Sequence, residues 1–332
     1  MRHIVMLCLL SISTVSFAET VNVYSFRQPF LIEPILESFT KETGIETQVI
    51  FAKKGLIQRI KREGKLSPAD VVLTSNFSKL LQLKTEGLTQ PFNQTDTINK
   101  NVPSQFRDSE AHWVALTKRV RNIYSSKARL GKLDISYEDL ANPTYKGKIC
   151  TRSGKHPYNL GLIASMIAHN GEAQTKVWLK GVKNNLARKP QGNDRAQVKA
   201  IKEGLCDVSL GNSYYLGKML NDKKQIPWAN AVELNFPNQA NRGSHINVSG
   251  AVIAKYSPNQ KAAQKLLAYL TTNTAQALYA ELNMEYPVKV DVAPSTLVSS
   301  WGAFKEDSIP LEDVAANIKT ALKLTDQTKF DL

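Results

Sequence analysis

The 332-residue chain has none of the short motifs on which common enzyme sites are built. It lacks a phosphate-binding G-x-x-x-x-G-K-[ST] loop, a G-x-G-x-x-G turn after its first apolar strand, an H-E-x-x-H zinc helix and a G-x-S-x-G nucleophile elbow. Its five histidines are dispersed without metal-ligand spacing, and only His156 and His245 lie near segments that we expect to form a site. Nothing in the sequence indicates an assembled catalytic group, so we expect that the protein is not an enzyme.

A membrane span is also missing, because no stretch approaches the roughly 18 consecutive apolar residues that a transmembrane helix needs. The first residues instead have the layout of a secretory signal: Arg2 and His3, an apolar run over residues 4–12, and the small-residue pattern that ends at Ala18. We predict that residues 1–18 are a signal peptide cleaved after Ala18. The protein is then exported to the periplasm without a stable membrane anchor.

Cysteine is scarce. Of the three cysteines, Cys8 lies in the predicted signal peptide, too early for a lipid-attachment site, and Cys150 and Cys206 remain. Neither belongs to a C-x-x-C pair, which disfavours a zinc site or thiol redox chemistry. An even number of cysteines in an oxidising compartment favours a disulfide between Cys150 and Cys206, and two free buried thiols are the alternative.

Acidic residues are outnumbered, 29 against 43 Lys and Arg, which gives a net charge of +14. Export and the scattering of the lysines argue against nucleic acid as a partner. A basic exterior suits anionic ligands or an anionic membrane surface, and it also simply keeps a protein in solution. The length suggests two domains.

Strands and helices alternate from the predicted start of the exported chain. Short apolar strands are expected at residues 21–24, 45–51 and 70–74, with helices at 31–41 and 56–63 between them. The first helix should stop at Gly44. This alternation predicts a parallel sheet covered by helices on both faces, an α/β fold.

The same pattern starts again in the second half. Strands are expected at 147–150 and 207–210, the latter followed by a Gly211-Asn212-Ser213 turn, with helices at 158–169, 172–185 and 196–203 and a mostly helical region from residue 257. Extended segments at 112–125 and 245–254 allow the chain to leave one lobe and return. We therefore predict a two-lobed protein with a strand hinge. Its N-terminal lobe comprises residues 19–118 and 245–293, and its C-terminal lobe comprises residues 119–244 and 294–332.

Three tyrosines stand just beyond the ends of predicted strands. Tyr214 and Tyr215 follow the strand at 207–210, and Tyr158 follows the strand at 147–150 at the start of a helix. In open α/β sheets this edge faces the ligand crevice. Ordinary half-buried packing is the alternative for each tyrosine.

Three converging phenols would suit a hard, highly charged cation. Ionising one phenol of pKa near 10 at pH 7 costs about 4 kcal/mol, and ionising three costs about 12 kcal/mol. Hard cations prefer oxygen donors, and a trivalent iron ion balances the charge of three phenolates. Its remaining coordination positions suit a small anion such as carbonate, for which Arg27, Arg119 and Arg121 are available.

Several stretches along nearly the whole chain carry a family resemblance: residues 23–30 (VYSFRQPF), 67–71 (SPADV), 185–192 (NLARKPQG), 211–215 (GNSYY), 247–250 (NVSG) and 285–288 (EYPV). The chain resembles the periplasmic ferric-ion-binding proteins that deliver iron to ABC transporters. The resemblance implies a type II periplasmic-binding-protein fold, an inner-membrane ABC permease as partner and a monomeric protein.

The resemblance also implies a ligand set. The family's tyrosine pair falls on Tyr214 and Tyr215, and its third tyrosine falls on Tyr158. Some members add a His-Tyr pair from the first loop, but Gln28 and Pro29 occupy those positions here. The better match is therefore the branch that uses three tyrosines and an anion.

By the same resemblance, Arg27, Gln28 and Arg119 are expected to bind the anion, with Arg121 as the less favoured alternative to Arg119. Two other hypotheses keep the fold. In one, the ligand is a small organic or inorganic anion held mainly by Arg27 and Arg119. In the other, the cleft is an enzyme site, which requires a free thiol at Cys150 or Cys206.

Overall fold

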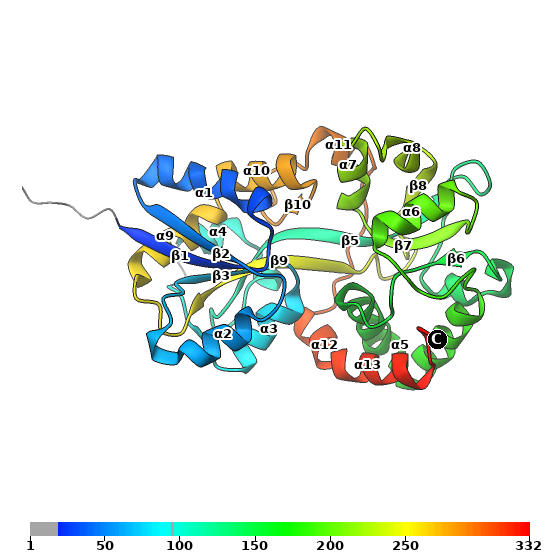
Figure 1. Cartoon of the computed structure of the whole chain (residues 1–332), viewed down its shortest axis with the longest axis horizontal. Helices are drawn as coiled ribbons and strands as arrows, with labels where there is room; N and C mark the ends of the chain where they lie inside the picture. Colours follow the sequence, from blue (N-terminus) through cyan, green and yellow to red (C-terminus); the bar gives the residue numbers. More distant parts are fainter. Residues whose placement is uncertain (1–18, 94–95) are drawn as a thin grey trace, which may run out of the picture.

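The computed structural model describes residues 19–93 and 96–332, so the predicted signal peptide lies outside the described residues. Two α/β lobes lie side by side along the long axis of the molecule, joined by two long strands (Figure 1). No helix within the described ranges is long and apolar enough to cross a membrane. The predicted fold class is confirmed.

The first lobe is built on parallel strands. Strand β1 (Thr20–Ser25) pairs in parallel with β2 (Glu46–Phe51) and with β3 (Val71–Thr74). Helices α1 (Pro29–Thr43) and α2 (Leu56–Glu63) make the crossovers. As predicted, α1 stops at Gly44, whose left-handed backbone (φ 72°) suits glycine.

Further elements complete this lobe. They are α3 (Phe77–Thr85), β4 (Thr89–Gln90), α4 (Asp96–Asn101), α9 (Gln260–Leu270), α10 (Asn273–Asn283) and β10 (Tyr286–Pro287). Helix α3 starts at the carboxyl end of β3, where the Asn76 side chain accepts a hydrogen bond from the amide of Lys79 at 3.1 Å.

The two predicted crossing segments are β5 (Val114–Ser126) and β9 (Ile246–Ala254), which run antiparallel to one another. All described strands form one sheet, whose main path runs β2-β1-β3-β9-β5-β7-β6. Because the crossing strands add antiparallel pairs, the sheet is mixed. Its parallel pairs are β1 with β2, β1 with β3, and β6 with β7.

The second lobe repeats the parallel arrangement with β6 (Ile149–Cys150) beside β7 (Val208–Asn212). Its other elements are α5 (Pro157–Asn184), α6 (Asp194–Lys202), α7 (Tyr214–Leu220), α8 (Ile226–Ala229) and β8 (Val232–Asn235). The two helices predicted at 158–169 and 172–185 are the two parts of α5, which is kinked at Gly171 (φ 77°).

One local prediction was wrong. Gly211 and Asn212 are not a turn but the last residues of β7, paired with Asn122 and Arg121 of β5. Only Ser213 separates β7 from α7. Gly211 is required here because an added Cβ would lie 2.3 Å from the Tyr124 ring.

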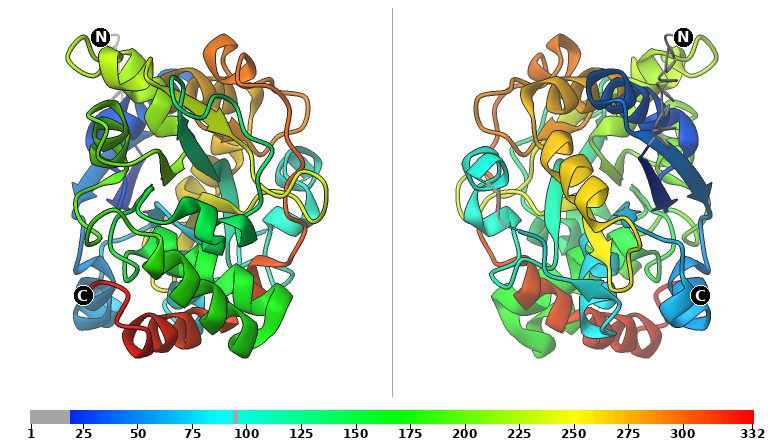
Figure 2. Two further views of the ribbon diagram at one scale, coloured as in Figure 1. Left: turned by 90° about the vertical axis from the view of Figure 1, so that its right-hand side faces the viewer. Right: turned by 90° about the vertical axis from the view of Figure 1, so that its left-hand side faces the viewer.

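The C-terminal segment closes the second lobe. It contains α11 (Thr296–Ser299), α12 (Leu311–Ala316) and α13 (Ile318–Gln327). Helices α12 and α13 lie along α5 in both views of Figure 2.

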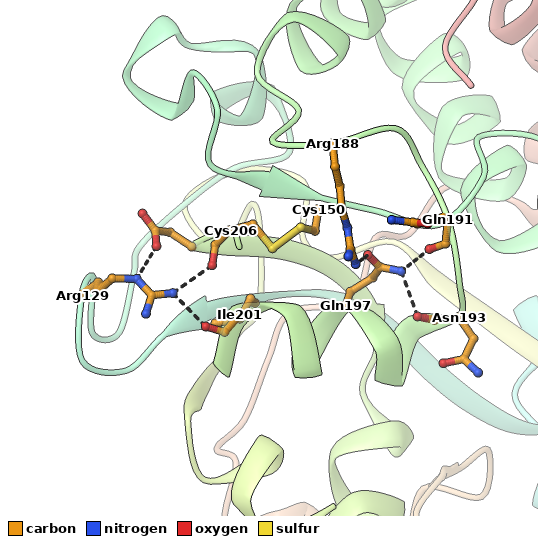
Figure 3. The surroundings of a disulfide bond; sticks show 9 residues. Arg129, Cys150, Arg188, Gln191, Asn193, Gln197, Ile201 and Cys206 are labelled. Atoms are coloured by element: carbon orange, nitrogen blue, oxygen red, sulfur yellow. Dashed lines mark hydrogen bonds and ion pairs between the residues drawn. A yellow bond between two sulfur atoms is a disulfide. The ribbon is translucent and has the colours of Figure 1, made fainter. Parts of the chain in front are cut away.

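A disulfide joins Cys150, the last residue of β6, to Cys206, two residues before β7, with the Cα atoms 5.8 Å apart (Figure 3). Beside it, Arg129 donates hydrogen bonds to the backbone carbonyls of Ile201 and Cys206 at 2.9 and 2.8 Å. The bond ties the two parallel strands of the lobe together. The enzyme hypothesis requires a free thiol at Cys150 or Cys206, and the disulfide leaves neither thiol free.

Candidate metal centre

The three predicted tyrosines come together at one edge of the second lobe. Strands β6 and β7 are parallel neighbours, so the segments that follow them leave the sheet at the same edge. The hydroxyl oxygens of Tyr158 and Tyr214 are 3.5 Å apart, and the ring centroids of Tyr214 and Tyr215 are 4.2 Å apart. All three side chains are half-buried. The arrangement brings three phenol groups from two separate chain segments to one place.

The phenols of Tyr214 and Tyr215 resist ionisation when no cation is bound. Burial raises the pKa of Tyr214 well above 10, and the neighbouring Tyr158 and Tyr215 phenols add to the shift. Burial and Tyr158 likewise raise the pKa of Tyr215. The pKa values rise further because neighbouring phenolates would repel one another. A cation placed between the oxygens would attract the phenolates and lower these pKa values.

His156 holds the start of α5, where Tyr158 lies. Its Nδ1 accepts a hydrogen bond from the amide of Tyr158 at 3.2 Å, and the two rings are 4.6 Å apart. Burial, together with the charge of Arg152, lowers the pKa of His156 to about 3, so the ring is neutral and can act as this acceptor. His156 thus orients the helix start.

Two of the predicted anion-binding residues share one carboxylate. Arg27 Nη2 lies 3.0 Å from Glu285 Oε2, and Arg119 Nη1 lies 3.3 Å from Glu285 Oε1. All three side chains are at most 5% exposed. Burial would raise the pKa of Glu285, but Arg27 and Arg119 outweigh burial and keep that pKa below its ordinary value. Two guanidinium groups against one carboxylate leave a surplus positive charge.

The positive charges of Arg27 and Arg119 interact electrostatically with the Tyr214 phenol. The charge of Arg119 opposes the upward shift in the pKa of Tyr214. Arg27 likewise interacts electrostatically with Tyr214. The third predicted anion ligand, Gln28, is exposed at the start of α1, next to Arg27.

Arg121, the alternative anion ligand, does not pair with Glu285, because its side chain is held by other partners. It forms ion pairs and hydrogen bonds with Asp194, Asn159 and Asn212 inside the second lobe. Sequence reasoning missed Glu285, Asp194 and Arg152 as partners of the predicted residues. Glu285 does stand in one of the stretches that carry the resemblance, but no local pattern links it to Arg119, 166 residues away.

No group of three or more His, Cys, Asp or Glu side chains that could hold a metal ion occurs among residues 19–93 and 96–332. Phenol oxygens are therefore the donor set that the described site offers, and this set suits a hard cation.

Comparison with known proteins fixes the family. The model of a bacterial extracellular solute-binding protein family matches residues 66–303. The chain belongs to this family. The family is described as bacterial extracellular solute-binding proteins.

Curated relatives of this solute-binding protein include iron uptake protein A1 of Synechocystis, 39% identical, with 93% of this chain and 87% of the relative covered. The major ferric iron-binding protein of Neisseria meningitidis is 28% identical, with 88% and 87% covered. A relative from Serratia marcescens is named as a periplasmic Fe(3+)-binding protein.

Solved structures agree with the fold. Apo ferric ion-binding protein A of Pasteurella haemolytica superposes with a TM-score of 0.90 at 56% identity, covering 95% of this chain and 99% of that one. A Trichodesmium protein in complex with iron and citrate ligands gives a TM-score of 0.89 at 38% identity, covering 94% and 99%.

Proposed function

We propose that this solute-binding protein captures ferric iron in the cleft between its lobes and delivers it to an inner-membrane ABC permease. Tyr158, Tyr214 and Tyr215 are the metal ligands, each as a phenolate. The observation that carries the proposal is the convergence of these phenols, with 3.5 Å between the Tyr158 and Tyr214 oxygens and raised pKa values for Tyr214 and Tyr215. A trivalent ion is the ligand that can offset the cost of removing three such protons.

A small anion completes the coordination shell. The Arg27–Glu285–Arg119 cluster supports this step, because two guanidinium groups share one carboxylate and a bound anion would balance the remaining positive charge. Arg27, Gln28 and Arg119 hold the anion, which we take to be carbonate. Citrate is the alternative, since it accompanies iron in the Trichodesmium complex.

The lobes comprise residues 19–118 with 245–293, and 119–244 with 294–332. The protein acts as a periplasmic monomer that is released from a signal peptide cleaved near Ala18, and it has no nucleic-acid partner. Closure of the lobes about β5 and β9 buries the iron, and reopening at the permease releases it.

Visible spectroscopy tests the metal assignment. Purified protein mixed with a ferric chelate and bicarbonate should gain a phenolate-to-iron charge-transfer band. Tyr158→Phe, Tyr214→Phe and Tyr215→Phe should each weaken or abolish it. The control is Tyr256→Phe, because Tyr256 is 40% exposed and lies outside the site. A wild-type protein that stays colourless and does not compete with the chelator contradicts the proposal.

The second candidate is a binding protein for a small anion without iron, and the surplus positive charge around Glu285 favours it. In that case phosphate, sulfonate or carboxylate ligands should raise the thermal midpoint of metal-free protein, and the tyrosine variants should respond as the wild type does. Ferric iron should give no additional stabilisation.

A further inference from the structure

Arg121 lies at the point where β5 changes its neighbour. Strand β5 pairs with β9 up to Val120, and with β7 from Arg121 onward. The amide of Arg121 still donates to the carbonyl of His245, at the start of the second crossing, at 2.9 Å. The residue therefore sits where the connecting strands enter the second lobe.

Its side chain reaches both segments that carry the tyrosines. Arg121 Nη2 donates to Asn159 Oδ1 at 2.6 Å, and Nη1 donates to Asn212 Oδ1 at 3.1 Å. Asn159 directly follows Tyr158, and Asn212 stands two residues before Tyr214. One guanidinium thus bridges the start of α5 to the end of β7.

A shared carboxylate fixes this guanidinium in place. Asp194, at the start of α6, pairs with both Arg121 and Arg152 and also accepts a hydrogen bond from the amide of Asn212 at 3.2 Å. Asp194 is fully buried and Arg121 is 2% exposed. The Arg152 guanidinium lies 5.3 Å from the centre of the Tyr158 ring. Burying two cations and one carboxylate is costly, which points to a purpose other than stability.

We propose that Arg121 is the positioning residue of the metal site: its forked guanidinium sets the spacing between Tyr158 and the Tyr214–Tyr215 pair. This inference rests on the proposed function. Arg121 acts through Asn159 and Asn212, with Asp194 as its anchor. The parallel pairing of β6 with β7 brings the two segments to one edge of the sheet, and Arg121 fixes the separation of their phenol oxygens, which suits one small, hard cation. Outer-shell partners of metal ligands act in this way generally.

Iron-release kinetics test the proposal. Arg121→Lys keeps the charge, but a single ammonium group cannot replace a planar fork that reaches two asparagines and a carboxylate. Loss of iron to excess EDTA should be about 10- to 100-fold faster than in the wild type. The charge-transfer band should also move. Arg129→Lys is the matched control, because Arg129 pairs with Asp207 in the same lobe and contacts neither tyrosine segment. Its kinetics and band should stay those of the wild type.

A double variant separates positioning from general destabilisation. In the Tyr158→Phe background one bridged segment no longer carries a ligand, so Arg121→Lys should have little further effect on iron loss. An equal effect in both backgrounds, or an equal effect of Arg129→Lys, overturns the proposal. If Arg121→Lys does not fold, as judged by circular dichroism, Asn159→Ala replaces it with the same expected acceleration and the same criterion.

These experiments distinguish a failure of the proposed iron binding from a failure of the positioning role of Arg121. A wild-type protein without a charge-transfer band contradicts the proposed function and Arg121's role with it. A wild-type band together with unchanged kinetics and band position in Arg121→Lys overturns the role of Arg121 alone.

Discussion

Lys218 of α7 donates a hydrogen bond of 2.7 Å to the backbone carbonyl of Leu282, in the last turn of α10. Helix α7 belongs to the tyrosine-bearing lobe and α10 to the other, so this contact spans the two lobes (Figure 1). A cation at the C-terminal end of a helix is stabilising by about 0.3–1 kcal/mol. Lys218 lies one helical turn after Tyr214, so the contact joins the helix that carries the tyrosine pair to the other lobe.

Lys218→Met should therefore favour the open form. Loss of about 0.3–1 kcal/mol corresponds to iron release that is roughly two- to fivefold faster, measured by the decay of the charge-transfer band in excess chelator. Lys199→Met is the control, because Lys199 pairs with Glu203 at the C-terminal end of α6, within the second lobe. Equal release rates for Lys218→Met and the wild type would show that this contact does not hold the lobes together.

The sequence predicts the elements of this fold better than the contacts between them. Alternating apolar strands and helices identified β1 to β3 with their crossovers, and the position of Tyr214 and Tyr215 beyond a strand end indicated the sheet edge at which the phenols gather. Gly211 and Asn212 were predicted to form a turn because both residue types favour turns. Their conformation is instead set by pairing with β5, some 90 residues earlier in the chain.

The charge clusters could not be predicted for a similar reason. Asp194 pairs with Arg121, 73 residues away, and with Arg152, 42 residues away. Neither separation follows a helical or strand period, so no local pattern contains them. Arg121 consequently read as a possible anion ligand, although the folded chain uses it between the tyrosine segments.

Glu285→Gln should destabilise the metal-free protein strongly. The substitution leaves the guanidinium groups of Arg27 and Arg119 buried without their shared carboxylate. Breaking a buried ion pair in this way costs about 3–5 kcal/mol in the free energy of unfolding, measured by urea denaturation. Bicarbonate should restore part of the loss if the same two arginines bind an anion.

Glu19→Gln is the matched control, because Glu19 pairs with Lys265 on the surface at 3.1 Å with both side chains well exposed. Its cost should be about 0–1 kcal/mol. The pH profile is a second check. Since Arg27 and Arg119 hold the pKa of Glu285 below its ordinary value, the stabilisation is present above that value and lost as the pH falls through the folded-state pKa. The free energy of unfolding of Glu285→Gln should lack this loss at low pH. Wild-type and variant curves of unfolding free energy against pH that run parallel would refute the stabilising role of the cluster.

Iron binding should release protons from the tyrosines. With no cation bound, burial and neighbouring phenols raise the pKa of Tyr214 and Tyr215 above 10, so both are protonated at neutral pH. A phenolate ligand must lose its proton, so the affinity for ferric iron should fall as the pH falls. Calorimetry at one bicarbonate concentration, in buffers of different ionisation enthalpy, measures the protons released. Tyr215→Phe should release about one proton fewer per iron bound than the wild type, because one phenol is missing and the contributions of chelator and anion cancel in the difference. Equal proton counts would mean that Tyr215 keeps its proton and is not an iron ligand.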